Sequence, residues 1–448
     1  MADAYNELSE RVCEVLDHLG YSESIVMFRR EIWRQRDLQR NSQEKHRTRI
    51  TAGSKMEGFS APCESDTDYV FLDNYTVCAL VGDTSHTPPE SLTALTLHAE
   101  QCSPGHFWLE LKHTGSVENM NIQKALFIHE DGRKFLSSYE FRKSFILNDK
   151  IESISGPALT KSNEYHSWDH VFAFRCTSQQ QLLMEWASRP RPHGWPSPGL
   201  VREVLQQDAQ IVPVGCKSSG NKDVQWRACF IPSEKKLSDS WNEFQYKMYI
   251  LLKFLKKTEL KPISDEMSSY LMKNVMFWFV EGKPLDVFTK STLLVNVQSC
   301  LKMFLKALKD NHLSYYMIPG RNLLTGRINP QQRHKLIVKL EELIQEGPRI
   351  VFRCPRVVEA LQLPPSELEG KGCWRDKLER LFRASENIGW SHWRPGMTRE
   401  EVDRCTWADP DFTAIKDLMA DMVWPQWRQH QEQDMNEVLY RKVADALS

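Results

Sequence analysis

The chain has 448 residues, more than a single hydrophobic core usually supports, so we expect two lobes and an extension. Apolar residues make up 41% and charged residues 26%, which is ordinary for a soluble globular protein. The net charge of −1 excludes a uniformly basic nucleic-acid binder, so any basic surface must be local.

No basic segment followed by an apolar core opens the sequence, and no apolar run reaches the roughly 20 residues of a membrane helix. We therefore expect no signal peptide and no membrane partner. The 11 cysteines are scattered without a C-x-x-C pair, which argues against a zinc ribbon. Free thiols and a cytoplasmic location are the prediction.

In chain order, residues 5–47 show helical spacing, with a break at Gly20. Residues 66–73 and 74–82 are rich in β-formers. Alternation of apolar and polar residues predicts further strands at the segments 106–113, 169–176 and 211–217.

From about Glu234 onward the spacing becomes helical. The sequence thus predicts an α+β fold with two lobes, a mixed β-sheet lobe and an all-helical lobe towards the C-terminus. The expected domains are 1–232, a core with a long N-terminal helix; 233–345, a helical lobe; and 346–448, a tryptophan-rich helical extension.

The segment "TAGSKMEGFSAPCESDTDYVF" (51–71) carries two carboxylates, Asp66 and Asp68. On a strand, residues two apart point to one face, so these carboxylates should lie side by side and require a cation. Oxygen ligands suit Mg²⁺ or Mn²⁺, and two such ions about 3.5–4 Å apart are typical of phosphoryl transfer. Asp169, which opens another alternating strand, is the expected third ligand, while His170 should face away from it.

Gly53 and Ser54 precede these acids. Glycine permits a tight turn whose N–H groups can point at phosphate, and the serine hydroxyl adds a donor. The plainer alternative is an ordinary turn followed by a solvated strand end. The order and spacing of the Gly-Ser pair and the two acids make a catalytic site and an ordinary turn about equally probable.

Taken together, these and further segments resemble the cyclic GMP-AMP synthase-like receptors of the Mab-twenty-one family of nucleotidyltransferases. The resemblance rests on the segment 53–71 and, in the same order, on "DHVFAFRC…EWASRPRPHGWPS", "VPVGCKSS…VQWRACFIPSEKKL" and "SSYLMKNVMFWFVEG". It covers residues 5 to about 325 and extends only weakly beyond them.

The resemblance implies a bilobed enzyme that joins two nucleoside triphosphates, ATP and GTP or others, into a cyclic dinucleotide for innate antiviral signalling. Double-stranded nucleic acid would activate it, with a ligand-induced dimer as one outcome. It assigns metal binding and catalysis, with two Mg²⁺ or Mn²⁺ ions, to Asp66, Asp68 and Asp169. It assigns nucleotide binding to Gly53, Ser54, Arg227, Lys253, Ser269, Tyr270 and Lys273.

The sequence departs from the family pattern in two places. Cys229 and Ile231 stand where two serines are usual, which leaves the choice of bases open. The segment 233–247 carries no His or Cys, so a zinc-binding thumb is not expected. Trp278 and Phe279 are interpreted as core aromatics.

Residues 28–50 carry eight basic side chains against three acidic ones. Arg29, Arg36 and Arg40 share roughly one helix face, and Arg47 follows; this surface suits phosphate contact without base reading. A solvated helix is the alternative, at about even odds. We expect double-stranded RNA, which is recognised by shape, but DNA stays open.

Three functions therefore compete: a nucleic-acid-activated cyclic dinucleotide synthase, a catalytically silent relative that only binds, and a template-free polymerase. The full set of Gly53, Ser54 and three aspartates favours the first.

Overall fold

The computed structural model describes residues 2–85, 87–146, 153–162, 167–425 and 435–447. The chain divides into two compact units, and each is assembled from separate segments. The first unit comprises Met1–Val15, Leu72–Pro157 and Phe172–Gln362; the second comprises Leu16–Phe71, Ala158–Val171 and Leu363–Ser448. The predicted boundaries after residues 232 and 345 do not coincide with this division.

A mixed sheet forms the first unit's β-layer. Its strands follow the order β2-β3-β4-β11-β10-β9, with β2 and β3 parallel and each later pair antiparallel. The bounds are β2 Thr67–Leu80, β3 Thr93–His98, β4 His106–His113, β11 Gln225–Cys229, β10 Ala209–Val212 and β9 Ser167–Cys176; β5 Leu126–Ile128, β6 Lys134–Leu136 and β7 Ser153–Ser155 are short. Strands β2 and β9 each begin in residues of the second unit.

The first unit also holds the predicted helical segment. Capping boxes open two of its helices, Asn242 with Gln245 before α10 and Asn329 with Gln332 before α13. The helices are α1 Ala2–Leu16, α4 Met120–Ala125, α5 Ser138–Lys143, α6 Gln179–Leu182, α7 Met184–Ser188, α8 Pro198–Leu205, α9 Ile231–Asp239, α10 Glu243–Leu255, α11 Ser269–Glu281, α12 Leu293–Lys309, α13 Pro330–Gln345 and α14 Pro355–Leu361.

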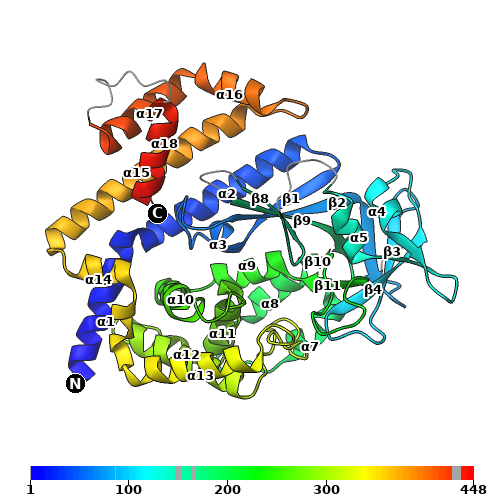
Figure 1. The fold of residues 1–448 in the computed structure, drawn as a ribbon, viewed down its shortest axis with the longest axis horizontal. Coiled ribbons are helices and arrows are strands. Elements are labelled where there is room, and N and C mark those ends of the chain that lie inside the picture. The colour runs from blue at the N-terminus through cyan, green and yellow to red at the C-terminus, as the bar shows by residue number, and fades with distance from the viewer. Residues whose placement is uncertain (1, 86, 147–152, 163–166, 426–434, 448) are drawn as a thin grey trace. The chain divides into compact units, whose positions relative to one another are not determined.

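The second unit combines one long helix, a few strands and four C-terminal helices. Figure 1 traces the long helix α2 in blue and its partner α15 in orange, lying alongside each other. The bounds are α2 Glu23–Gln43, β1 Arg47–Ala52, α3 Gly53–Met56, β8 Ala158–Ser162, α15 Pro365–His392, α16 Arg399–Trp407, α17 Pro410–Val423 and α18 Met435–Leu447. Leu378, Phe382, Met419, Leu439 and Val443 form a buried core between α15, α17 and α18.

The prediction of a mixed α+β fold is confirmed, and so is the helix break at Gly20, which adopts φ +87°. The two β-rich segments at 66–82 form one strand, β2, rather than two. The strand predicted at 211–217 ends at Val212. In the part of the chain that the structure describes, no helix is both long and apolar enough to cross a membrane. All eleven cysteines are free thiols.

Candidate functional site

The three predicted acids lie in the second unit, at the starts of two strands. Asp68 is the second residue of β2, and Asp169 is the third residue of β9. Asp66 is exposed and stands directly before β2, so strand alternation does not fix the direction of its side chain. Asp68 and Asp169 are half-buried.

Aromatic contacts identify the face of the strands that carries Asp68 and Asp169. The ring of His170 lies 5.9 Å from that of Tyr69 and 5.3 Å from that of Phe71, measured between centroids. These three residues therefore share one face, as predicted for His170. Since successive side chains on a strand alternate, Asp68 and Asp169 lie on the opposite face.

Hydrogen bonding fixes the orientation of Asp169. Strands β8 and β9 pair antiparallel with Thr160 opposite Asp169, and the Thr160 hydroxyl donates to Asp169 Oδ1 at 2.7 Å. One carboxylate oxygen is thus held in place from the neighbouring strand. The other oxygen of Asp169 remains the one that can turn towards a cation.

Gly53 lies directly against Asp68. It adopts φ +65°, and a Cβ atom built on it would stand 2.2 Å from Asp68 Oδ2. Any side chain at this position would clash with the Asp68 carboxylate, and the left-handed φ would strain it further. The glycine of the predicted phosphate turn and the first acidic strand therefore belong to one site.

The loop between this turn and the acids is held by a buried lysine. Lys55 follows Ser54, is 1% exposed, and donates from Nζ to the carbonyl oxygens of Ala61, at 2.7 Å, and Pro62. Burial lowers the pKa of Lys55 to about 7. Glu64 reinforces the loop by accepting from the Tyr21 hydroxyl at 2.6 Å.

The donor set fits a hard divalent cation. Three carboxylates, on one helix-turn-strand segment and one neighbouring strand, supply only oxygen, which Mg²⁺ and Mn²⁺ prefer. Within the described residues, the oxygens of the three acids do not all come within 4.8 Å of one another. The absence of a side chain at Gly53 lets the Asp68 carboxylate approach the turn directly.

The residues predicted to bind a nucleotide lie in the first unit, apart from Gly53 and Ser54. The Tyr270 hydroxyl donates to Glu234 Oε1 at 2.8 Å, and the Tyr315 hydroxyl donates to the same oxygen at 2.6 Å. Tyr270 therefore has a hydrogen-bonding role beside its ring, which the sequence analysis did not anticipate. The carbonyl oxygen of Ser269 accepts from the Tyr249 hydroxyl at 3.4 Å.

The two predicted lysines differ in burial. Lys273, one helical turn after Tyr270, is 7% exposed. Lys253 is half-buried, with its Nζ 5.9 Å from the centroid of the Tyr249 ring. Phe279 is 3% exposed, which agrees with its interpretation as a core aromatic. Trp278 is half-buried and donates to the carbonyl oxygen of Ser314 at 2.9 Å.

Two arginines lie close to Arg227 that the sequence pattern did not identify. Burial and then the charge of Arg227 lower the pKa of both Arg321 and Arg327, so the three guanidinium groups are close enough to repel one another. Arg227 Nε is buried without a hydrogen-bond partner among the described residues. The only signal in the sequence was the pair of Gly-containing turns at 319–327, which lie far from Arg227 along the chain.

The basic face predicted on α2 is largely buried inside the second unit. Arg29 is 0% exposed and forms a two-bonded ion pair with Glu379, with both N–O distances 2.6 Å. Arg36 is 3% exposed and pairs with Glu386 at 3.0 Å. The prediction that Arg29 and Arg36 face solvent is therefore wrong, because α15 covers them.

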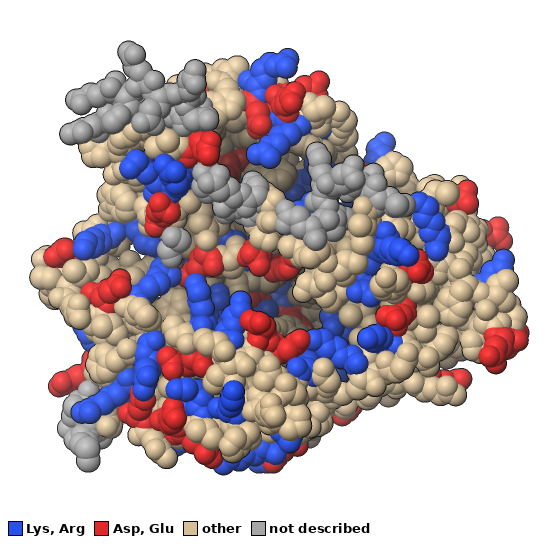
Figure 2. Space-filling view, in the orientation of Figure 1, with Lys and Arg blue, Asp and Glu red and all other residues tan. Residues whose placement is uncertain are grey.

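Arg40 is half-buried, with its guanidinium carbon 3.2 Å from the centroid of the Trp393 ring. Arg47 is exposed, as is Lys45. Figure 2 shows Lys and Arg interspersed with Asp and Glu on the visible face. Of the four arginines predicted to contact nucleic acid, Arg47, the first residue of β1, is thus the one that is exposed.

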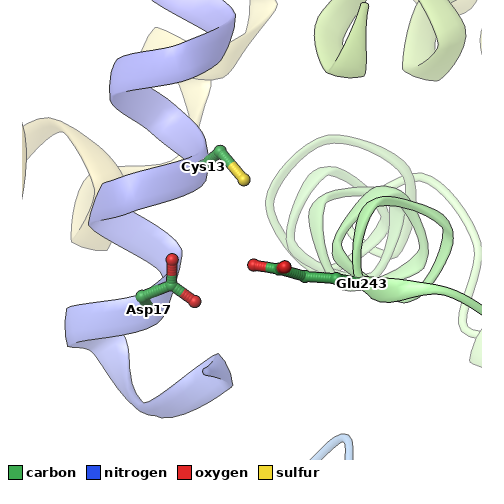
Figure 3. Close-up of side chains that lie close together, drawn as sticks. All are labelled: Cys13, Asp17 and Glu243. Carbon is green, nitrogen blue, oxygen red and sulfur yellow. The ribbon is translucent and has the colours of Figure 1, made fainter. Parts of the chain in front are cut away.

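A cysteine and a glutamate that could both ligate a metal ion lie close together in the first unit. Figure 3 shows Cys13 and Glu243 pointing towards the same space. Lys247 is 0% exposed; its Nζ lies 3.3 Å from Cys13 Sγ and forms an ion pair with Glu243. A lysine ammonium group thus already serves both, and the pair is a structural one.

Comparison with known proteins bears on the helical segment. Residues 245–342 match the family model described as the Mab-21 protein HhH/H2TH-like domain. The match runs from α10 into α13, and supports a relationship to the Mab-21 family there, in line with the resemblance of the sequence. No curated protein matches the chain.

Proposed function

We propose that this chain is a divalent-metal-dependent nucleotidyltransferase that joins two nucleoside triphosphates, ATP and GTP or others, into a cyclic dinucleotide. The observation that carries the proposal is the packing of Gly53 against Asp68, with Asp169 on the same face of the neighbouring strand. A solvated strand end would not require a glycine with φ +65° against its carboxylate.

Asp66, Asp68 and Asp169 would hold two Mg²⁺ or Mn²⁺ ions, which supply charge neutralisation for phosphoryl transfer. Thr160 keeps Asp169 oriented, so little reorganisation is needed when it binds a cation. The Ser54 hydroxyl and the N–H groups of the turn would position the triphosphate.

In the first unit, Arg227 and the ring of Tyr270 would contact a nucleobase, and Ser269, Lys253 and Lys273 would complete nucleotide binding. The cluster of Arg227, Arg321 and Arg327, with one unused buried donor at Arg227 Nε, suits an anionic group. Arg321 and Arg327 are residues that the family resemblance did not supply, and their proximity to Arg227 supports a role of the cluster in nucleotide binding.

Double-stranded RNA or DNA is the proposed activating ligand, and antiviral signalling in the cytoplasm is the proposed setting. Because Arg29 and Arg36 are buried, we expect exposed residues such as Lys45 and Arg47 to contact the phosphates. A ligand-induced dimer belongs to the same proposal.

The test is incubation with labelled nucleoside triphosphates and Mg²⁺ or Mn²⁺, with and without RNA or DNA duplexes. We expect a product that resists phosphatase, since a cyclic dinucleotide has no terminal phosphate. Asp68→Asn and Asp169→Asn should retain the wild-type melting temperature and less than about a tenth of the activity, because metal ligands carry most of this catalysis.

Asp73→Asn is the matched control: Asp73 lies on the same strand but bonds to Thr76 and Asn119, and this variant should stay active. A product that phosphatase degrades would indicate a polymerase instead. If wild-type protein binds Mn²⁺ and duplex but forms no product, the chain is a silent binding protein.

A further inference from the structure

The second unit contains a cavity that the proposed catalysis does not use. Its volume is about 740 Å³, and it is lined by α15, α16, α17, α18 and one residue of β9, Trp168. This volume is within the range of sites that enclose a whole small molecule. Because Trp168 and Asp169 are successive residues of a strand, their side chains point to opposite faces, and the cavity is separate from the acidic site.

The lining of the cavity is predominantly aromatic and apolar. Indole rings come from Trp168, Trp390, Trp393 and Trp407, and Phe382 and Met419 belong to both the lining and the buried core. Flat rings stack favourably on such surfaces and bury a large apolar area. The walls therefore favour a rigid aromatic ligand over a flexible polar one.

One charged group of the lining belongs to the inner wall. Glu386 Oε2 accepts from Arg36 at 3.0 Å and from Arg383 at 2.8 Å, whereas Oε1 has no hydrogen-bond partner among the described residues. Burial alone would raise the pKa of Glu386, but the two arginines outweigh it and hold the pKa at about 2. At neutral pH Glu386 is thus ionised, and its Oε1 is an acceptor in the lining.

The other charges lie near the solvent. Arg399 and Asp403 are 83% and 54% exposed and pair with each other at 3.7 Å. Lys416 lies with its Nζ 5.2 Å from the centroid of the Trp407 ring. Glu437 also lines the cavity and is exposed. These groups of opposite sign give the rim no strong preference for a ligand charge.

We propose that this cavity binds a neutral, flat aromatic molecule with an N–H group that donates to Glu386 Oε1. The aromatic walls supply stacking, and the carboxylate supplies a charge-assisted hydrogen bond in a site of low polarity. An anionic ligand of the same shape is disfavoured, because burying its charge between apolar walls carries a desolvation cost.

Two fluorescent probes of matched shape test this proposal. N-phenyl-1-naphthylamine is neutral, aromatic and carries one N–H group, and 1-anilinonaphthalene-8-sulfonate adds a sulfonate to the same skeleton. We expect the neutral probe to bind at least tenfold more tightly than the sulfonate. Excitation of tryptophan should produce probe emission, since four indole rings line the cavity.

A cavity-filling substitution locates the site. Gly389 lines the cavity on α15, and an added Cβ would stand 3.6 Å from Thr406 Oγ1, an ordinary contact. Gly389→Leu should weaken binding of the neutral probe at least tenfold. Gly370→Leu is the matched control, since Gly370 is on the same helix with nothing within 4 Å of its added Cβ; it should bind as the wild type does.

Val402→Phe fills the cavity from α16 and replaces Gly389→Leu if that variant does not fold. Absence of neutral-probe binding to the wild type would overturn the proposal. So would equal affinity for the two probes, or unchanged affinity in a folded cavity-filling variant. None of these results depends on nucleotide turnover, so the proposal stands or falls separately from the proposed enzyme.

Discussion

Gly53 is the residue on which the candidate site depends most directly. Gly53→Ala should weaken Mn²⁺ binding at least tenfold, because its Cβ would stand 2.2 Å from Asp68 Oδ2. It should also destabilise the fold by about 1–2 kcal/mol, the cost of a left-handed φ for a residue with a side chain. Calorimetric Mn²⁺ titration and urea denaturation measure the two effects.

Gly82→Ala separates contact from strain. Gly82 adopts φ +77° with nothing within 4 Å of an added Cβ, so this variant should lose stability but keep Mn²⁺ affinity. Equal Mn²⁺ affinity in the two variants would mean that the contact of Gly53 with Asp68 does not support a metal site.

Lys55 gives the fold a specific dependence on pH. Its pKa is about 7 in the folded chain, against about 10.4 in an unfolded one. Between these values the unfolded chain binds a proton that the folded chain does not. Stability should therefore rise with pH by about 1.4 kcal/mol per unit over this window, and should lose that gain as the pH falls to 7.

Urea denaturation of the wild type and Lys55→Met at about pH 7.5 and about pH 9.5 tests this. The stability of the wild type relative to the variant should be greater at the higher pH. Lys371→Met, at a lysine that is 61% exposed, should show no such change. A constant difference between wild type and Lys55→Met would show that Lys55 stays protonated across the window.

At the residue scale, candidate site residues could be selected from the sequence, but the contacts between them could not be predicted. The D-x-D pattern and Gly-Ser pair led to the predicted site residues, which stay a prediction, but the contact of Gly53 with Asp68 depends on one backbone torsion that no pattern encodes. Arg321 and Arg327 could not be associated with Arg227 from spacing, since about a hundred residues intervene.

The pair of α2 and α15 explains why the basic helix was misread. Its Arg–Glu contacts recur after seven residues on both helices, from Arg29 with Glu379 to Arg36 with Glu386. The two helices therefore run parallel in constant register. Trp33 lies in the same stripe and is 4% exposed, and this spacing is the sequence signal that the stripe faces a partner helix.

Breaking the inner ion pair should be costly. Glu379→Ala leaves the Arg29 guanidinium buried and unpaired, which typically costs 3–5 kcal/mol. Replacing both partners, as in Arg29→Met with Glu379→Leu, should restore most of the loss, since an apolar pair needs no compensation. A urea-denaturation cycle over the four proteins measures this.

Glu31→Ala provides the comparison on the same helix. Glu31 pairs with Arg34, but the two side chains are 52% and 53% exposed, so its loss should change stability little. If Glu379→Ala is as mild as Glu31→Ala, α15 does not hold α2 through this pair.

At the scale of the whole molecule, the order of helices and strands was predictable, but the division of the chain into two compact units was not. The helices of 233–345 followed from their periodicity, and the match over 245–342 agrees with them. The tryptophan-rich segment was expected to begin an independent extension at 346, yet residues up to 362 belong to the first unit and later ones to the second. Such a division depends on contacts between distant segments, which local patterns do not contain.

The burial of Arg36 changes the test of activation by a duplex. Arg36→Glu with Arg40→Glu would place a carboxylate beside Glu386 in a buried site, so this double variant should lower the melting temperature. Any drop in stimulation in it would report damage to the fold. Lys45→Glu with Arg47→Glu changes exposed residues and should leave the melting temperature unchanged.

If Lys45 and Arg47 contact phosphate, the second variant should lose duplex-stimulated synthesis and keep basal, Mn²⁺-supported synthesis. Its log–log slope of affinity against salt should flatten by roughly 0.9 for each DNA phosphate that the protein no longer neutralises. The physical route to the site is short, because β1 runs directly into Gly53 and is anchored to α2 by Asp37, which accepts from the Thr51 backbone at 2.7 Å and from Arg49 at 3.0 Å. A bound duplex could thus shift the turn through one strand. An unchanged slope with full stimulation would place the activating surface elsewhere on the chain.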